Sequence, residues 1–259
     1  MKEQIDWITS AQANEYIYER LTEVLLPKGF TEYASLAKTL ARAGEHHIQM
    51  VCQEIIEEET VIKMSAVPMW TYQDRGCFGR YIRLKYSESV AYGRNSYAII
   101  AYKQKTSKRV YYRLDELAHV WDTAMFPQLH TELIDFYDSM NFAAYAQLCE
   151  EERDKTWDFW FSYSESRLFT RGYNCLWKDK YDEGRVWIEK AIAEAERYLV
   201  MLEAWGERVD ARYLQDLNAG KGIVDIINQR KTGWEEAVHG RLSGLEKEVL
   251  KKKGIPLPV

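Results

Sequence analysis

The pattern of apolar residues changes at about residue 114, and this change limits the folds that the 259-residue chain can adopt. Before it, short segments rich in β-branched and aromatic residues are separated by turn signals, which is typical of strands. Their short connections favour antiparallel neighbours, because a parallel pair needs a crossover of about a dozen residues. After it, apolar residues recur every three or four positions, as in helices. The sequence therefore predicts an α+β fold, with an N-terminal helix, a mostly antiparallel sheet with helices, and an all-α C-terminal domain.

Local signals place the expected elements of the first half. Ser10 is expected to cap a helix in which Ile17 and Leu21 follow helical spacing. Pro27-Lys28-Gly29 is expected to end that helix, since glycine readily takes the left-handed conformation that closes a helix. Strands are expected at residues 36–42, 46–56, 61–70, 81–86, 97–102 and 110–112.

The second half is expected to be helical. Asp115 is expected to cap one helix and Pro127 to open another, because proline is favoured in a first helical turn. Helical patterns continue to Leu250, with breaks expected near Gly206, residues 220–222 and Gly233. We place the domain boundary at about residue 145, which gives an α+β domain at residues 1–145 and a helical domain at residues 146–259.

Composition excludes several classes of protein. With 46% hydrophobic and 29% charged residues, the chain is expected to be globular. No window approaches the run of about 18 apolar residues that a membrane span needs, so we expect a soluble, cytoplasmic protein that does not bind membranes. Four cysteines lie far apart without a CxxC pair, which argues against structural zinc and predicts reduced thiols.

Residues 80–113 are basic and rich in tyrosine, although the whole chain has a net charge of −5. This basic segment holds nine Lys/Arg, one acid and seven tyrosines, a charge of +8 (nine minus one), so the remainder of the chain sums to −13. A local departure of this size points to a binding surface. The candidate residues are Arg80, Tyr81, Arg83, Lys85, Tyr86, Tyr92, Arg94, Tyr97, Tyr102, Lys103, Lys105 and Arg109.

Three uses of the basic segment stay open. Lysine and arginine neutralise phosphates while tyrosines stack on unpaired bases, as in single-strand nucleic-acid binding. Residues 1–113, however, carry 16 cations and 13 acids, a smaller excess than nucleic-acid domains usually show. Residues 114–259 carry 19 cations and 27 acids, so the segment could instead dock on an acidic surface of this chain or of a second copy, or be a plainly solvated face. An acidic protein partner is the third use.

No motif predicts catalysis, a metal or a cofactor. His46 and His47 are adjacent in an expected strand, so they would face opposite sides and could not share a metal. His119 and His130 lack a metal-binding spacing and are expected at the surface. Cys52 or Cys77 beside His46 or His47 would be a nucleophile–base pair only if the fold brought them together, and no local signature supports this.

Two stretches carry a family resemblance. Leu21, Leu25, Leu26 and Lys28-Gly29-Phe30 at the front, with the Asp115 to Met140 helices behind, are similar to the bacterial family called domain of unknown function 4304. That resemblance covers about half of the chain and implies a fold and a bacterial source rather than an activity. In addition, residues 171–199 resemble one tetratricopeptide-like helical hairpin, with Gly172, Ala191 and Ala195 where two helices would approach closely.

These observations favour a non-enzymatic protein-binding module, of the adaptor or immunity type. Single-stranded nucleic-acid binding through the basic segment is the alternative. Nine tryptophans and eighteen tyrosines also favour self-association, because these side chains combine a large contact area with a polar tip.

Overall fold

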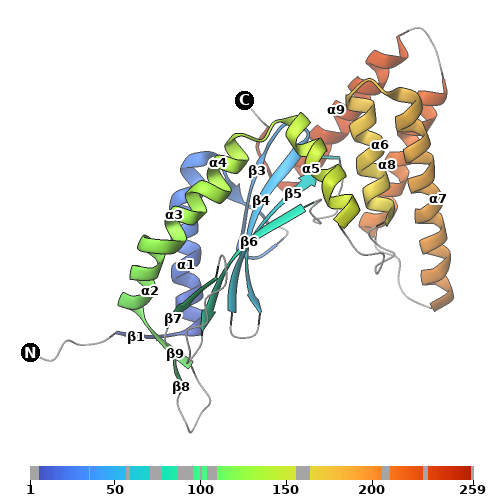
Figure 1. Cartoon of the computed structure of the whole chain (residues 1–259). Helices are drawn as coiled ribbons and strands as arrows, with labels where there is room; N and C mark the ends of the chain where they lie inside the picture. Colours follow the sequence, from blue (N-terminus) through green and yellow to red (C-terminus); the bar gives the residue numbers. More distant parts are fainter. Residues whose placement is uncertain are drawn as a thin grey trace, which may run out of the picture. The chain divides into compact units, whose positions relative to one another are not determined.

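The structure is a computed structural model that describes residues 6–34, 36–56, 59–70, 78–86, 96–99, 101–103, 110–155, 164–205, 211–229 and 233–257 (Figure 1). It confirms the predicted fold class, with sheets and helices followed by a helical C-terminal region. The chain divides into two compact units: unit 1 is Met1–Arg42, Gln49–Ser65 and Gly79–Met140, and unit 2 is Ala43–Ile48, Ala66–Phe78 and Asn141–Val259. A single domain boundary near residue 145 remains a prediction, since each unit is built from several stretches of the chain.

The described strands form two sheets. The larger has the order β2-β3-β4-β5-β6-β7 and comprises β2 (Thr31–Glu32), β3 (Thr39–Ala43), β4 (His47–Ile56), β5 (Glu59–Pro68), β6 (Phe78–Tyr86) and β7 (Ser96–Ile99). The smaller has the order β1-β9-β8 and comprises β1 (Trp7–Thr9), β9 (Val110–Arg113) and β8 (Ala101–Lys103), all antiparallel.

Two strand expectations need correction. β6 and β7 pair in parallel, with Arg83 opposite Ser96 and Tyr86 opposite Ile99, although a short connection favoured an antiparallel pair. The strand expected at residues 97–102 is split, so that β7 joins the larger sheet and β8 the smaller. Neither β1 nor β2 was expected, because two or three residues are too few to show strand alternation.

Helix α1 (Ser10–Leu25) covers the larger sheet. Its cap is Thr9 rather than Ser10, since Thr9 and Gln12 form a capping box. The short 3₁₀ helix η1 (Leu26–Lys28) follows, and Gly29 ends the helical run at φ 81° as expected. On β4, Gln49 bonds to the Tyr137 carbonyl and Gln53 to that of Asn14. These two glutamines are four residues apart on one strand face, so α1 and the helix containing Tyr137 lie on the same side of the sheet.

That second helix runs without a break from Leu114 to Asp138, so Pro127 does not open a new helix. It comprises α2 (Leu114–Val120), η2 (Trp121–Met125), α3 (Phe126–Gln128), η3 (Leu129–Ile134) and α4 (Asp135–Asp138), of which η2 and η3 are π-helical. Asp115 lies inside its first turn, and Arg113 holds the cap position.

The spacing of buried residues explains the π-helical turns. Leu117, Trp121, Met125 and Leu129 recur every fourth residue and are each at most 2% exposed. An α-helix has about 3.6 residues per turn, so such a stripe would rotate by about 40° at each step. A π-helical turn takes more residues, about 4.4. Alternating the two geometries brings the average close to four and keeps the stripe on the core.

Arg42 joins three parts of unit 1. Its guanidinium donates to Gln49 Oε1 at 2.6 Å, to the Lys28 carbonyl at 2.8 Å and to Asp138 Oδ1 at 2.6 Å. It also lies 4.7 Å from the centre of the Phe30 ring. One side chain thereby fixes the end of the first helical run, the sheet and the end of α4, and its charge-assisted bonds are of the stronger kind.

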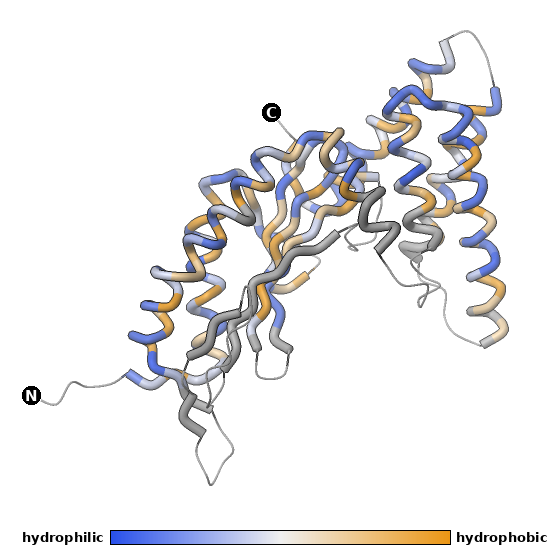
Figure 2. Tube along the Cα trace, in the orientation of Figure 1, coloured by the Kyte–Doolittle hydropathy of each residue, from blue (hydrophilic) through white to orange (hydrophobic). Residues whose placement is uncertain are grey.

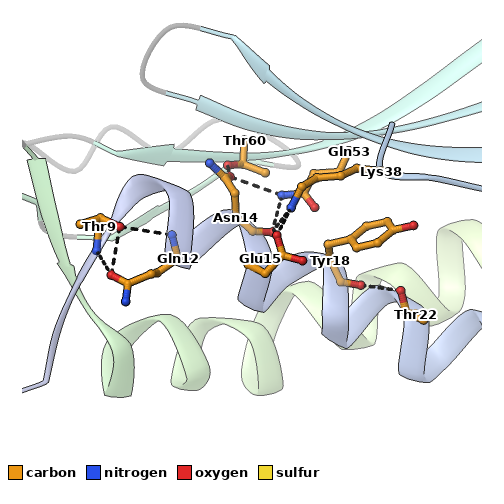
Figure 3. A network of polar contacts seen from close by, with 9 residues as sticks. All are labelled: Thr9, Gln12, Asn14, Glu15, Tyr18, Thr22, Lys38, Gln53 and Thr60. Carbon is orange, nitrogen blue, oxygen red and sulfur yellow. Dashed lines mark hydrogen bonds and ion pairs between the residues drawn. The ribbon is translucent and has the colours of Figure 1, made fainter. Parts of the chain in front are cut away.

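A buried polar network fixes α1 on the sheet (Figure 3). The side-chain oxygen of Asn14 accepts from the Thr60 hydroxyl at 2.5 Å and from Gln53 Nε2 at 3.3 Å. At its edge, Lys38 donates to Glu15 at 2.7 Å. Because buried polar groups are costly unless paired, this network favours one register of α1 on the sheet.

Unit 2 contains five helices in the described residues: α5 (Phe142–Lys155), α6 (Ser164–Trp177), α7 (Tyr181–Trp205), α8 (Ala211–Asn228) and α9 (Trp234–Lys253). Hydrophobic and hydrophilic residues alternate in bands along α7 and α9 (Figure 2). The core joins α6, α7, α8 and α9 around Tyr173, Ile188, Ile223 and Leu242. α8 continues through residues 220–222, where a break was expected.

The strand ends in unit 2 pack among these helices. Trp70 stacks on Tyr173 at 4.1 Å and lies 5.8 Å from Phe169, between ring centres. His47 is fully buried and stacks on Tyr145 at 4.7 Å. These aromatic contacts bury the strand ends in the helical core and add specific ring–ring geometry to it.

Helices α6 and α7 approach closely at two glycines. A Cβ at Gly172 would lie 2.5 Å from Ile188 Cγ1 and 3.2 Å from the Gly184 carbonyl oxygen. A Cβ at Gly184 would lie 2.8 Å from a Leu176 methyl. Only glycine permits α6 and α7 to lie this close at these two positions, because some of the atoms that a Cβ would meet belong to the backbone of the other helix and cannot move aside.

We predict that Gly172→Ala lowers the free energy of unfolding by about 1–3 kcal/mol through overpacking. Gly244→Ala is the matched control, since its Cβ would meet nothing within 4 Å, and it should leave stability unchanged or raise it by up to about 1 kcal/mol. Urea denaturation followed by circular dichroism measures both. Equal effects of the two substitutions would contradict the close approach.

Candidate functional site

The backbone places the described part of the basic segment on β6 and β7 of the larger sheet and on β8 and β9 of the smaller. β6 carries Arg80, Tyr81, Arg83, Lys85 and Tyr86, β7 carries Tyr97, and β8 carries Tyr102 and Lys103. The parallel register puts Lys85 opposite Ala98, and the antiparallel one puts Tyr102 opposite Tyr111. Tyr92, Arg94, Lys105 and Arg109 lie outside the described residues. The segment therefore belongs to both sheets rather than to a single one.

A second candidate surface, which we call the ring ladder, lies wholly within unit 2. Its rings are each partly exposed and belong to Phe142, His46, Trp177, His239, Tyr181 and Trp234. In that order, successive ring centres are 5.0, 3.8, 5.3, 6.0 and 4.2 Å apart. These are contact distances for aromatic pairs, so the ladder is continuous. No sequence signal revealed it, because its members come from the β3–β4 turn, α5, α6, α7 and α9.

His46 makes the polar contacts at one end of the ring ladder. Its Nδ1 lies 3.1 Å from both carboxylate oxygens of Glu246, whose side chain is only 9% exposed. The ring is stacked on Trp177 with an interplanar angle of 17°. His46 lies in the turn before β4, not in a strand, with φ 59°. A positive φ is uncommon for a residue with a side chain, so the stacking and the carboxylate contact together hold it there.

A second histidine–carboxylate contact lies at the other end. His239 Nε2 is 3.2 Å from the Tyr181 hydroxyl and 3.3 Å from Asp179 Oδ1. Tyr181 donates to Asp179 Oδ1 at 2.8 Å. Burial raises the pKa of the Tyr181 hydroxyl, and the charges of Asp179 and Glu235 raise it further. Tyr181 therefore stays protonated and acts as a hydrogen-bond donor.

Carboxylates surround the ladder. Glu45 accepts from the backbone N–H of Phe142 at 2.7 Å, Glu246 contacts His46, and Asp179 and Glu235 act on Tyr181. Aromatic faces beside carboxylates favour cationic groups. The chain already shows this chemistry in unit 2, where the guanidinium of Arg171 lies 3.6 Å from the centre of the Trp187 ring. The described residues contain no group of three side chains suited to a metal.

The described thiols are poorly suited to nucleophilic attack. Burial raises the pKa of Cys52, whose side chain interacts with Thr39. Burial, with the nearby Glu183, raises the pKa of Cys175 to about 11. Since the thiolate is the reactive form, both are held in the unreactive state. Cys77, the other candidate partner for His46 or His47, lies outside the described residues.

The remaining histidines take separate positions. His47 contacts the Glu45 carbonyl oxygen through Nδ1 at 2.7 Å. His119 and His130 are exposed, as expected, and His130 lies 3.4 Å from Asp135. His46 and His47 thus have different neighbours: Glu246 and Trp177 for His46, and the Glu45 carbonyl and Tyr145 for His47.

Comparison with known proteins gave no match: no protein-family model, no curated protein and no solved structure is significantly similar to this chain. The two family resemblances therefore remain predictions. Among the described residues, no helix has both the length and the apolar character needed to cross a membrane.

We predict that Cys175 is alkylated slowly by iodoacetamide in the folded protein at about pH 7.5, because few thiolates form so far below its pKa. The rate should rise about tenfold per pH unit up to about pH 11 and increase sharply in denaturing urea. Mass spectrometry of the Cys175 peptide measures it. Equal labelling of folded and unfolded protein at neutral pH would contradict the raised pKa of Cys175.

Proposed function

We propose that this chain is a non-enzymatic, cytoplasmic protein-binding module of the adaptor or immunity type. The ring ladder is the observation that carries the proposal, because it offers partly exposed aromatic rings in continuous contact. Aromatic side chains are enriched in the cores of protein interfaces, where they bury a large area at a small cost in conformational entropy.

Polar groups around the ladder support the same function. Asp179, with its side chain 71% exposed, supplies a charged rim. An apolar centre with a polar rim is the usual anatomy of an interface.

The charge of the basic segment, nine Lys/Arg against one acid, would attract an acidic partner. Its cations on β6 would steer association with such a partner by long-range attraction. Its charge of +8 also favours the alternative, single-stranded nucleic acid. The two partners differ in a measurable way, because phosphate contacts release counterions and lose affinity steeply as salt rises.

Reversal of two β6 cations tests the proposed function. We expect the wild-type protein to capture a partner protein from its native cell extract. The double variant Arg83→Glu/Lys85→Glu should capture at least about tenfold less of this partner, because the reversed charges would repel an acidic protein instead of attracting it. Reversal of Arg197 and Lys221 to Glu is the control, because these exposed cations, 49% and 44% exposed, lie on α7 and α8. Quantitative mass spectrometry gives the readout.

Two results would count against the proposal. Equal retention of the partner by both double variants would remove the basic segment from the interface. Tight binding of a labelled oligo(dT) at about 50 mM salt, lost at about 500 mM, would favour nucleic acid instead. We expect no such binding.

A further inference from the structure

We infer that the Tyr181 end of the ring ladder is a guanidinium site, which binds the side chain of an arginine on the partner protein. The inference rests on the proposed function, and it names the group of the partner that the ladder recognises. The site comprises Asp179 in the α6–α7 turn, Tyr181 at the start of α7, and Trp234, Glu235 and His239 in the first two turns of α9. All five are exposed or partly exposed and belong to unit 2.

The hydrogen-bonding groups of the site favour a ligand that donates. Nε2 of His239 lies 3.2 Å from the Tyr181 hydroxyl, 3.3 Å from Asp179 Oδ1 and 3.4 Å from the Leu176 carbonyl oxygen. Because all three neighbours are oxygens and Tyr181 already donates to Asp179, these contacts assign the proton to Nε2. The neutral ring then has a lone pair on Nδ1, which can only accept. Tyr181 and His239 both contact Oδ1 of Asp179, so Oδ2 can accept a further hydrogen bond.

The charge of this site is negative. Burial raises the pKa of the Tyr181 hydroxyl, and the charged groups that raise it further, Asp179 and Glu235, are both carboxylates. Lys178 and Lys180 flank Asp179 in the chain, but neither is among the groups that act on this hydroxyl. The Asp179 side chain is 71% exposed and Glu235 is exposed, so a partner meets both charges. A cationic group is therefore favoured over a neutral or anionic one.

The rings of the site narrow the choice of cation. The centres of the Tyr181 and Trp234 rings are 4.2 Å apart, and the two planes are inclined by 66°. A guanidinium is planar, stacks on aromatic faces and donates hydrogen bonds from its edge, whereas an ammonium is a compact and strongly hydrated charge. Arginine is the side chain that can cover a ring face and donate to Asp179 at the same time.

The chain already binds one of its own arginines in this way. The guanidinium of Arg171 lies 3.6 Å from the centre of the Trp187 ring, and the Trp187 indole donates to Glu183 at 3.4 Å. Among the described residues, lysines and arginines lie over the rings of Tyr16, Tyr18, Phe30 and Trp187. The guanidinium site offers an indole and carboxylates of the same kind, and an arginine of the partner would complete the set.

Three capped tripeptides test the site on the full-length protein: Gly-Arg-Gly, Gly-citrulline-Gly and Gly-Lys-Gly. Citrulline keeps the planar shape without the charge, and lysine keeps the charge without the plane. The indole N–H signal of Trp234 in a ¹⁵N heteronuclear NMR spectrum, assigned with Trp234→Phe, reports binding. We expect the arginine peptide to bind at least about tenfold more tightly than the citrulline peptide and about threefold more tightly than the lysine peptide.

A double variant tests the carboxylates. Asp179→Asn with Glu235→Gln keeps side-chain size, and asparagine tolerates the positive φ of Asp179. We expect this variant to bind the arginine peptide at least about tenfold more weakly. The control, Glu189→Gln with Asp225→Asn, removes two exposed carboxylates from α7 and α8 and should bind within about twofold of the wild type. Circular dichroism of each variant confirms that loss of binding is not loss of folding.

Free arginine distinguishes a partner protein from a small guanidino compound as the source of the group. The capped peptide should bind at least as tightly as free arginine, because Asp179 and Glu235 repel the α-carboxylate of the free amino acid. Free arginine that binds at least about tenfold more tightly than the peptide would overturn the assignment to a protein.

Two further results would overturn the inference: equal binding of the arginine and citrulline peptides, or equal binding of the arginine peptide by the wild type and the carboxylate variant. Capture from the native cell extract separates this inference from the proposed function. We expect Asp179→Asn with Glu235→Gln to capture at least about tenfold less of the partner. Undiminished capture by this variant would refute the guanidinium site and leave the proposed function standing, whereas no capture by the wild type would refute the proposed function itself.

Discussion

The contact of His46 with Glu246 and Trp177 joins the turn before β4 to helices α9 and α6 of unit 2. Glu246 is a buried carboxylate, and His46 is the partner that the described structure gives it. A buried polar group without a partner is unfavourable, so this contact favours a position of the turn against α9 and α6. This turn lies in residues 43–48, which belong to unit 2. In the ring ladder, the His46 ring lies between those of Phe142 and Trp177 and contacts both.

Unit 1 depends on different interactions. Arg42 joins the sheet to both helical runs, and Asn14 fixes α1 through buried hydrogen bonds. Most of its remaining stability comes from apolar side chains, such as the four-residue stripe of the Leu114 to Asp138 helix. Lys28, Phe30 and Asp138 all contact Arg42, so packing explains these positions without any role in chemistry.

Much of the fold could be predicted from local signals. The α+β class and the end of the first helical run at Gly29 follow from periodicity and from one glycine. Local signals failed where a distant neighbour decided the outcome. Pro127 lies inside a helix whose π-helical turns keep buried residues, spaced four apart, on the core. Helix α8 continues through two glycines, and one of them, Gly220, lies against Phe169. The basic segment was visible as a charge excess, whereas the ring ladder was not, since residues 46, 142, 177, 181, 234 and 239 meet only in the folded chain.

The central claim is that the ring ladder is a protein-binding surface, and the indole N–H signals of its tryptophans test this most directly. A heteronuclear NMR spectrum of ¹⁵N-labelled wild type, assigned with single Trp→Phe variants, would be recorded during titration with the unlabelled partner protein captured from the native cell extract. The account predicts that the signals of Trp177 and Trp234 shift, while those of Trp70 in the core and of Trp187 beside Arg171 stay in place. Unchanged signals for Trp177 and Trp234 in a titration that forms a complex would contradict it.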